Sequence, residues 1–174
     1  MINFKTEKTN NGTLIITKYC GQESDVVIPS EIDGKKVSEI GEEAFANCES
    51  LKNVIISDGI TMIGDYAFKN CPNLESIKIP NSIEEMGIYV FAFEDSYEPS
   101  TVDVFYDGTI DEWNEIEKYQ LSYQNLQIKC SDGEWEEWRE DTFDELYSDE
   151  DDCGFDEEND FDEENDFDDE EDYE

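Results

Sequence analysis

Hydrophobic and polar positions along this chain recur with a period of 23 residues. In the two clearest copies, an Ile-Gly pair is followed by an Ala-Phe pair, a Cys, and a Leu with further aliphatic residues. A weaker third copy keeps Met86-Gly87 and Phe91 in step. This regularity predicts small units that bury their apolar faces only against neighbouring units. The matched positions are Ile40-Gly41 and Ile63-Gly64, Ala44-Phe45 and Ala67-Phe68, Cys48 and Cys71, Leu51 and Leu74, Val54 and Ile77, and Ile56 and Ile79.

Each unit is predicted to contain one short strand with a single buried face. Val54 and Ile56 alternate with their neighbours, as do Ile77 and Ile79, and such alternation is typical of a half-buried strand. The strand of the third unit is expected at residues 102–106. Stacked units would place these strands side by side and parallel, at the usual sheet spacing of about 4.8 Å.

The segment that returns from each strand is predicted to bend sharply and then fill the interior. Gly41, Gly64 and Gly87 are expected to permit a bend that a side chain would resist. Phe45 and Phe68, each preceded by a small Ala, are expected to fill the core.

Both ends of the stack have recognisable features. Residues 12–17 predict an opening strand, and residues 25–29 the strand of a partial first unit, followed by an insertion at residues 32–36 that forms an exposed turn. Near the other end, Thr109 and Glu112 have the spacing of a capping box and predict a helix. Three apolar residues of this helix are expected to cover the open end of the core, namely Ile110, Trp113 and Ile116.

The five cysteines indicate free thiols, because their number is odd. Stacking would bring the backbones of Cys48 and Cys71 within disulfide range. The favoured interpretation is that each is a small buried residue in the same position of its own unit. Free thiols fit a reducing compartment, and residues 1–7 lack the charged and apolar stretches of a secretory signal, so a cytoplasmic location is expected.

Several of these segments resemble BspA-like leucine-rich repeat proteins, over about residues 10–133. The resemblance implies a leucine-rich-repeat solenoid dominated by a short parallel β-sheet, with small helical or 3-10 turns and a C-terminal capping helix. It also implies a curved scaffold for recognising proteins or surfaces, with no catalytic residues to carry over, in a family whose members are often exported and adhesive. The segments that carry it are residues 11–19, 27–29, 32–35, 37–41, 44–45 and 48 at the start, and 106–109, 112–114, 116 and 128–133 at the close.

The exposed face of the predicted sheet is the candidate binding surface. Its positions fall into three columns across the strands, and the middle column places apolar groups in solvent. One interpretation is an interaction patch flanked by polar residues; the other is that β-branched and aromatic residues simply suit strands. The columns are Asp25, Asn53, Ser76 and Asp103; Val27, Ile55, Lys78 and Phe105; and Pro29, Ser57, Pro80 and Asp107, and the candidate partner-binding residues are Val27, Asn53, Ile55, Ser76, Lys78, Asp103 and Phe105.

Charge divides the chain into two predicted parts. Of the net charge of -38, residues 134–174 carry -24, from 25 acidic residues and one Arg. Self-repulsion at this density opposes a compact core. We therefore expect a solenoid with its caps at residues 1–133 and an acidic tail at residues 134–174.

The tail contains a short aromatic repeat of its own. Phe155, Phe161 and Phe167 recur every six residues among acids, which suits docking onto a basic partner and equally suits a tail that only keeps molecules apart. Before it, a short helix is predicted at residues 134–147, with one side formed by Trp135, Trp138, Thr142 and Leu146.

Catalytic chemistry is not predicted. The chain has no His, which removes the commonest general base and mixed Cys/His zinc sites, and no cofactor or metal site is expected. The sequence therefore predicts a non-catalytic scaffold, monomeric, that binds a protein partner through its exposed sheet face. A basic protein suits the charge; direct binding of nucleic acid or membrane does not. The alternative is an acidic decoy or chaperone whose tail binds a basic or nucleic-acid-binding protein.

Overall fold

A computed structural model describes residues 3–92, 101–118 and 126–135 of the 174-residue chain, and all of them lie in the first of its two units, Met1–Glu137. Several predicted features fall outside the described residues. They are the side chains of Trp138, Thr142 and Leu146, and the acidic tail with Phe155, Phe161 and Phe167.

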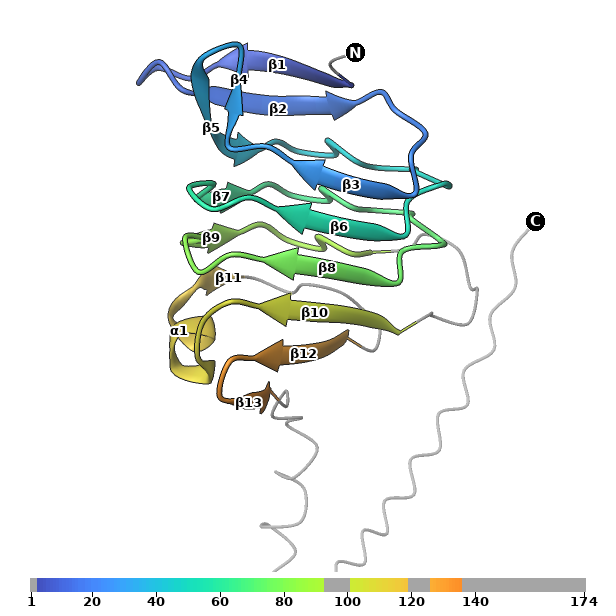
Figure 1. Cartoon of the computed structure of the whole chain (residues 1–174), viewed down its shortest axis with the longest axis vertical. Coiled ribbons are helices and arrows are strands. Elements are labelled where there is room, and N and C mark those ends of the chain that lie inside the picture. The colour runs from blue at the N-terminus through green and yellow to red at the C-terminus, as the bar shows by residue number, and fades with distance from the viewer. Residues whose placement is uncertain (1–2, 93–100, 119–125, 136–174) are drawn as a thin grey trace, which may run out of the picture. The chain divides into compact units, whose positions relative to one another are not determined.

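Two β-sheets face each other across the core (Figure 1). From β2 onward the chain alternates between them, so each coil of the solenoid gives one strand to each sheet. The seven-stranded sheet has the order β1 (Phe4–Lys8), β2 (Leu14–Tyr19), β5 (Lys35–Ile40), β7 (Met62–Ile63), β9 (Glu85–Met86) and β11 (Glu117–Lys118), with β4 (Glu31–Ile32) paired to β5. The six-stranded sheet has the order β3 (Asp25–Ile28), β6 (Asn53–Ile56), β8 (Ser76–Ile79), β10 (Val102–Tyr106), β12 (Leu126–Cys130) and β13 (Gly133–Trp135).

The strand register confirms the predicted repeat. In the six-stranded sheet, Val54 is opposite Ile77 and Ile77 is opposite Val104, all in parallel pairs. In the seven-stranded sheet, Ile40 is opposite Ile63. The fold is thus a β-solenoid of stacked parallel strands, and the strand predicted at residues 102–106 is β10.

The turns between the strands are also paired from coil to coil. The Phe45 N–H donates to the Ala67 carbonyl at 2.8 Å, and the Phe68 N–H donates to the Val90 carbonyl at 2.9 Å. These segments are turns and not 3-10 helices in the described residues. Hydrogen bonds between coils therefore satisfy backbone groups that a loop would otherwise leave to water.

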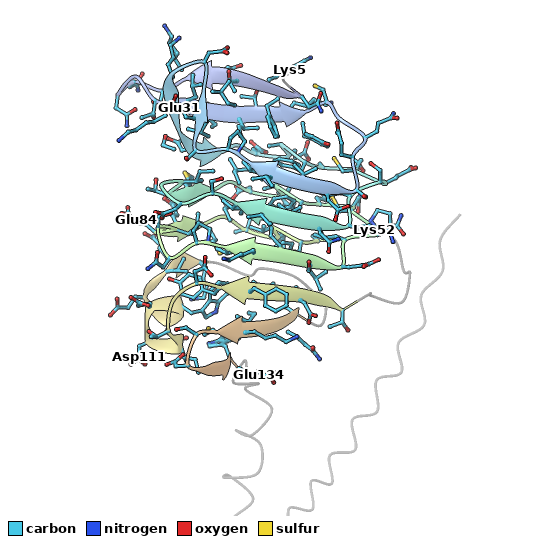
Figure 2. All side chains as sticks on the ribbon, viewed as in Figure 1. Lys5, Glu31, Lys52, Glu84, Asp111 and Glu134 are labelled. Atoms are coloured by element: carbon cyan, nitrogen blue, oxygen red, sulfur yellow. The ribbon has the colours of Figure 1, made fainter. Side chains whose placement is uncertain are left out.

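A column of aromatic rings runs through the core between the sheets, where side chains fill the space (Figure 2). Tyr19 stacks on Phe45 with ring centroids 5.2 Å apart, Phe45 on Phe68 at 5.0 Å, and Phe68 on Phe91 at 5.9 Å. Phe45 and Phe68 are fully buried, as predicted. Leu51 and Leu74 are buried as well. The repeated letters of the sequence thus correspond to repeated contacts in the core.

The repeated glycines serve close packing, which corrects the predicted reason for them. None of Gly41, Gly64 and Gly87 has a positive φ, so none is needed for an unusual bend. A methyl group on Gly64 would instead lie 2.8 Å from backbone atoms of Gly41 and Glu42 in the preceding coil. A side chain there would push two coils apart.

The insertion at residues 32–36 forms a small hairpin rather than only an exposed turn. Strands β4 and β5 pair antiparallel through a two-residue loop, Asp33-Gly34, whose φ values of 51° and 75° suit a type I′ turn. Ile32 is buried because it packs into the core cluster.

The C-terminal part of the stack differs from the prediction. Helix α1 (Ile110–Glu115) is present with its capping box at Thr109 and Glu112, and Trp113 is fully buried. However, β12 and β13 extend the six-stranded sheet past β10, so the role of α1 as the cap is not confirmed. Residues 134 and 135 belong to β13 and not to a helix, because a tight hairpin turn after Cys130 pairs β13 with β12; residues 136–147 lie outside the described residues.

Four cysteines are described, and all are free. Cys71 is buried, as predicted, whereas Cys48 is only half-buried. A hydrogen bond with Cys71 and the nearby Lys18 charge lower the pKa of the Cys48 thiol. The same hydrogen bond and burial raise the pKa of Cys71, and burial raises the pKa of Cys130.

Replacing a ring of the aromatic column should strongly destabilise the solenoid. We expect Phe68→Ala to lower the free energy of unfolding by roughly 3 to 5 kcal/mol, because it leaves a cavity between two stacked rings. Phe105→Ala is the matched control: the same residue type, 41% exposed, should cost less than about 1 kcal/mol. Urea denaturation followed by circular dichroism measures both; similar losses would contradict the column's role.

Alkylation should distinguish the thiols by their ionisation. Cys48 and Cys130 are both half-buried, but their pKa values are shifted in opposite directions. Because the thiolate is the reactive form, iodoacetamide should label Cys48 at a lower pH and faster than Cys130, with Cys71 last. Peptide mapping by mass spectrometry over a pH series measures this order, and equal rates at Cys48 and Cys71 would refute it.

Candidate functional site

The candidate site is the face of the six-stranded sheet that points away from the core, here called the outer face. Along each strand, residues alternate between the core and this face. All seven predicted partner-binding residues lie on it, in the predicted columns. The outer face consists of Asp25, Val27, Asn53, Ile55, Ser76, Lys78, Asp103, Phe105, Gln127 and Lys129.

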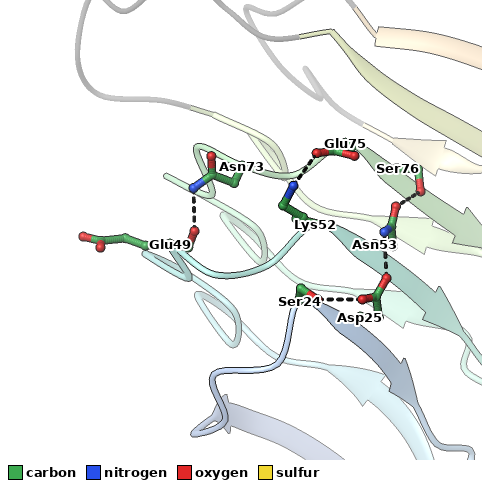
Figure 3. A network of polar contacts seen from close by, with 8 residues as sticks. All are labelled: Ser24, Asp25, Glu49, Lys52, Asn53, Asn73, Glu75 and Ser76. Atoms are coloured by element: carbon green, nitrogen blue, oxygen red, sulfur yellow. Dashed lines mark hydrogen bonds and ion pairs between the residues drawn. The ribbon is translucent and has the colours of Figure 1, made fainter.

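The first column is a ladder of side-chain hydrogen bonds (Figure 3). Asn53 donates to Asp25 at 2.7 Å, and Ser76 donates to Asn53 at 2.8 Å. Hydrogen bonds from Ser24 and Asn53 lower the pKa of the Asp25 carboxyl below its ordinary value. These side chains are therefore fixed by one another before any partner arrives.

Beside this ladder, Lys52 and Glu75 form an ion pair at 2.9 Å across neighbouring coils (Figure 3). The pair raises the pKa of Lys52. Both side chains are largely exposed, so the pair adds little stability. Its effect on the surface is to hold opposite charges next to the polar ladder.

The middle column carries the apolar groups. Val27, Ile55 and Phe105 have exposed fractions of 58%, 46% and 41%, and they are the exposed large hydrophobic residues of the described part of the chain. Lys78 lies between Ile55 and Phe105 in the register. Its ammonium group is directed to Asp107 at 2.9 Å, so its charge is held at the strand ends and its stem stays in the column.

The aromatic end of the column is held by Lys129. The ammonium nitrogen of Lys129 lies 5.2 Å from the ring centroid of Phe105, within the range of a cation–π contact. The same nitrogen is 3.0 Å from the Asp103 carboxylate. Phe105 is thus covered on one side and presents its remaining surface to solvent.

Gln127 and Lys129 were missed in the sequence interpretation, although β12 adds them to the first and middle columns. A signal was available, because Ile128 and Cys130 follow Val104 and Tyr106 by 24 residues, which is close to the repeat period. The third predicted column, Pro29, Ser57, Pro80 and Asp107, lies directly after the ends of the four strands.

The arrangement suits binding by surface contact. Within residues 3–92, 101–118 and 126–135, no group of three or more His, Cys, Asp or Glu side chains is placed to hold a metal ion. No helix in that same part of the chain is long and apolar enough to cross a membrane. The outer face thus places an ordered polar column beside an exposed apolar column.

Comparison with solved structures identifies the same fold elsewhere. A leucine-rich repeat protein of Treponema pallidum is 26% identical with a TM-score of 0.53, over 69% of this chain and 62% of that one. A leucine-rich repeat protein of Bacteroides capillosus is 20% identical with a TM-score of 0.58, over 75% of this chain and 96% of that one. The chain therefore spans less than two thirds of the Treponema protein.

Comparison of the sequence with curated proteins gave no match. The family model for the BspA-type leucine-rich repeat region, in contrast, matches residues 16–131 with six copies of the repeat. This range contains the strands of both sheets from the middle of β2 to β12, together with the aromatic column. The chain belongs to the BspA-type leucine-rich repeat family.

Proposed function

We propose that the protein is a non-catalytic recognition scaffold that binds a protein partner through its outer face. The observation that carries this proposal is the middle column: Val27, Ile55 and Phe105 are exposed, and all three lie in one line on one face. Leucine-rich repeat families and folds are generally non-enzymatic scaffolds for interactions.

The rigidity of the outer face supports this role. Binding costs less when the contacting side chains are already ordered. The Asp25–Asn53–Ser76 ladder and the contacts of Lys129 supply that order, and Val27, Ile55 and Phe105 still remain exposed. Large apolar side chains surrounded by polar groups also suit the composition of an interface hot spot.

Charge introduced into the middle column should abolish partner binding. We expect the double variant Ile55→Glu/Phe105→Glu to weaken binding by roughly thirty-fold or more, the loss typical of removing hot-spot contacts. Affinity capture identifies the partner with the wild-type protein, and titration calorimetry with the purified partner measures the loss.

The matched control for this experiment is Asn10→Glu/Asn81→Glu. It adds the same charge at two exposed turn positions away from the outer face. The control should bind like the wild type, and circular dichroism should be unchanged in both variants. Undiminished binding by the Ile55/Phe105 variant would refute the proposed face.

A second candidate function is favoured by the charge of residues 134–174. These residues carry -24, with Phe155, Phe161 and Phe167 spaced among the acids. Such a segment suits an acidic decoy or chaperone that engages a basic or nucleic-acid-binding protein. We rank it second, because a DNA mimic also needs charges fixed at near-phosphate spacing, about one per 1.7 Å.

Deleting residues 136–174 tests this second function. If the tail binds a basic partner, the deletion should remove the interaction, and the wild-type affinity should fall steeply between low and physiological salt because exposed charges are screened. Fluorescence anisotropy with the captured partner over a salt series measures both. A partner that binds the truncated protein equally well is not bound by the tail.

A further inference from the structure

The two sheets do not end at the same level at the N-terminal end of the stack. The seven-stranded sheet continues from β5 to β2 and then to β1, whereas the six-stranded sheet stops at β3 (Figure 1). Strand β3 is therefore an edge strand, with β6 on one side and no strand on the other.

The backbone of β3 has two residues whose hydrogen-bonding groups face the open side. The Ser24 and Ile28 carbonyls accept from the N–H groups of Asn53 and Ser57, at 2.9 and 3.0 Å. Because strand residues alternate in direction, Asp25 and Val27 point their N–H and C=O groups away from β6. Within the described residues, no group pairs with them.

A hollow of about 450 Å³ lies against this edge. Its lining includes Asp25 and Val27 from β3, and the rings of Phe4 and Tyr19 from the neighbouring hairpin. The volume is in the range of sites that hold a ligand. The open backbone groups thus border a space that an added chain can enter.

The lining of the hollow is acidic. Glu23, Asp25, Glu31 and Asp33 border it, and it has no Lys or Arg. The Tyr19 hydroxyl donates to the Glu23 carboxylate, which lowers the pKa of Glu23, while burial and this bond raise the pKa of Tyr19 to about 12. Glu23 therefore stays ionised and Tyr19 stays protonated at neutral pH.

We infer that β3 is a docking edge for an extended peptide that carries Lys or Arg. The peptide would pair with the free backbone groups of Asp25 and Val27, and its basic side chains would face the acidic lining. Strand addition to a free sheet edge is an established mode of peptide recognition. The edge uses backbone groups of β3, whereas the outer face consists of side chains; the two surfaces share only Asp25 and Val27, so the edge adds a second contact to the proposed scaffold.

A second copy of the chain is a poor occupant. Pairing β3 with β3 would bring the acidic linings of two copies close together, and opposed like charges destabilise a strand pair. Asp25 and Pro29 are also residues that discourage general pairing at an edge. A basic partner avoids the repulsion between like charges. It needs only the open backbone groups of Asp25 and Val27 for pairing.

The test uses the full-length protein and a fluorescein-labelled, six-residue peptide of alternating Lys and Val. Hydrogen exchange followed by NMR should show the amides of Asp25 and Val27 protected when the peptide is bound. Val27→Pro removes the outward N–H and is tolerated on an edge strand. It should weaken binding by roughly five-fold or more, as expected for the loss of one hydrogen bond.

Three controls separate the edge from other sites of the chain. Val27→Thr keeps the N–H and should bind within about two-fold of wild type. A peptide with methylated backbone nitrogens keeps its charge but cannot donate backbone hydrogen bonds. It should therefore bind the wild-type protein as weakly as the unmodified peptide binds the Val27→Pro variant. Ile55→Glu/Phe105→Glu should not weaken binding, which separates a failure here from a failure of the outer face.

Several outcomes would overturn the inference. Equal binding of the methylated peptide would assign the binding to general attraction by the acidic residues, and this result does not depend on how Val27→Pro folds. If the peptide gave no protection of the β3 amides and instead shifted the NMR signals of Ile55 and Phe105, the binding would be assigned to the outer face. Sedimentation showing a dimer that Val27→Pro abolishes would assign the edge to a second copy.

Discussion

Stacking of each coil on the next is the constraint on which this structure depends. No coil buries its own apolar residues; Phe68 is buried because Phe45 and Phe91 lie on its two sides. The backbone follows the same rule, since Phe45 and Phe68 donate to carbonyls of the following coil. The stack even imposes unusual conformations, because Tyr66 and Tyr89 have φ values of 55° and 51° at equivalent positions. A left-handed conformation at a non-glycine residue is unfavourable in isolation. It is tolerated here because contacts with the neighbouring coils stabilise it.

The same translation that orders the core also orders the surface. A residue on the outer face is followed one coil later by another at the same position, so side chains meet in columns without any further folding. Asn53 and Ser76 illustrate this, since one column yields a continuous hydrogen-bond ladder. The middle column collects apolar groups for the same reason. A change at an outer-face position of one repeat therefore alters one row of the surface and leaves the stacked core intact.

The sequence predicted those parts of the fold and candidate site that repeat, and failed where pairing is not local. Strands β6 and β8 have alternating residues and the 23-residue spacing, and β10 keeps the alternation 27 residues after β8, so their register and the columns on the outer face could be predicted. Strands β7, β9 and β11 have two residues each, too few to show any period. Strand β1 pairs antiparallel with β2 and has no counterpart in the repeat. Lys129 was missed because the Ile-Gly and Ala-Phe pairs that mark a repeat are absent between β10 and β12.

The ends of the stack show how a repetitive structure is prevented from continuing indefinitely. Parallel ladders are self-complementary, so an exposed end invites another copy. The N-terminal end of the seven-stranded sheet is closed by the antiparallel strand β1, and the C-terminal end of the six-stranded sheet by the antiparallel strand β13. An antiparallel strand changes the hydrogen-bond pattern at its edge, so a further coil cannot stack there in the parallel register of the repeats. At β3 the protection is instead chemical: Asp25, Pro29 and the acidic residues nearby exclude a like-charged copy while leaving two backbone positions open.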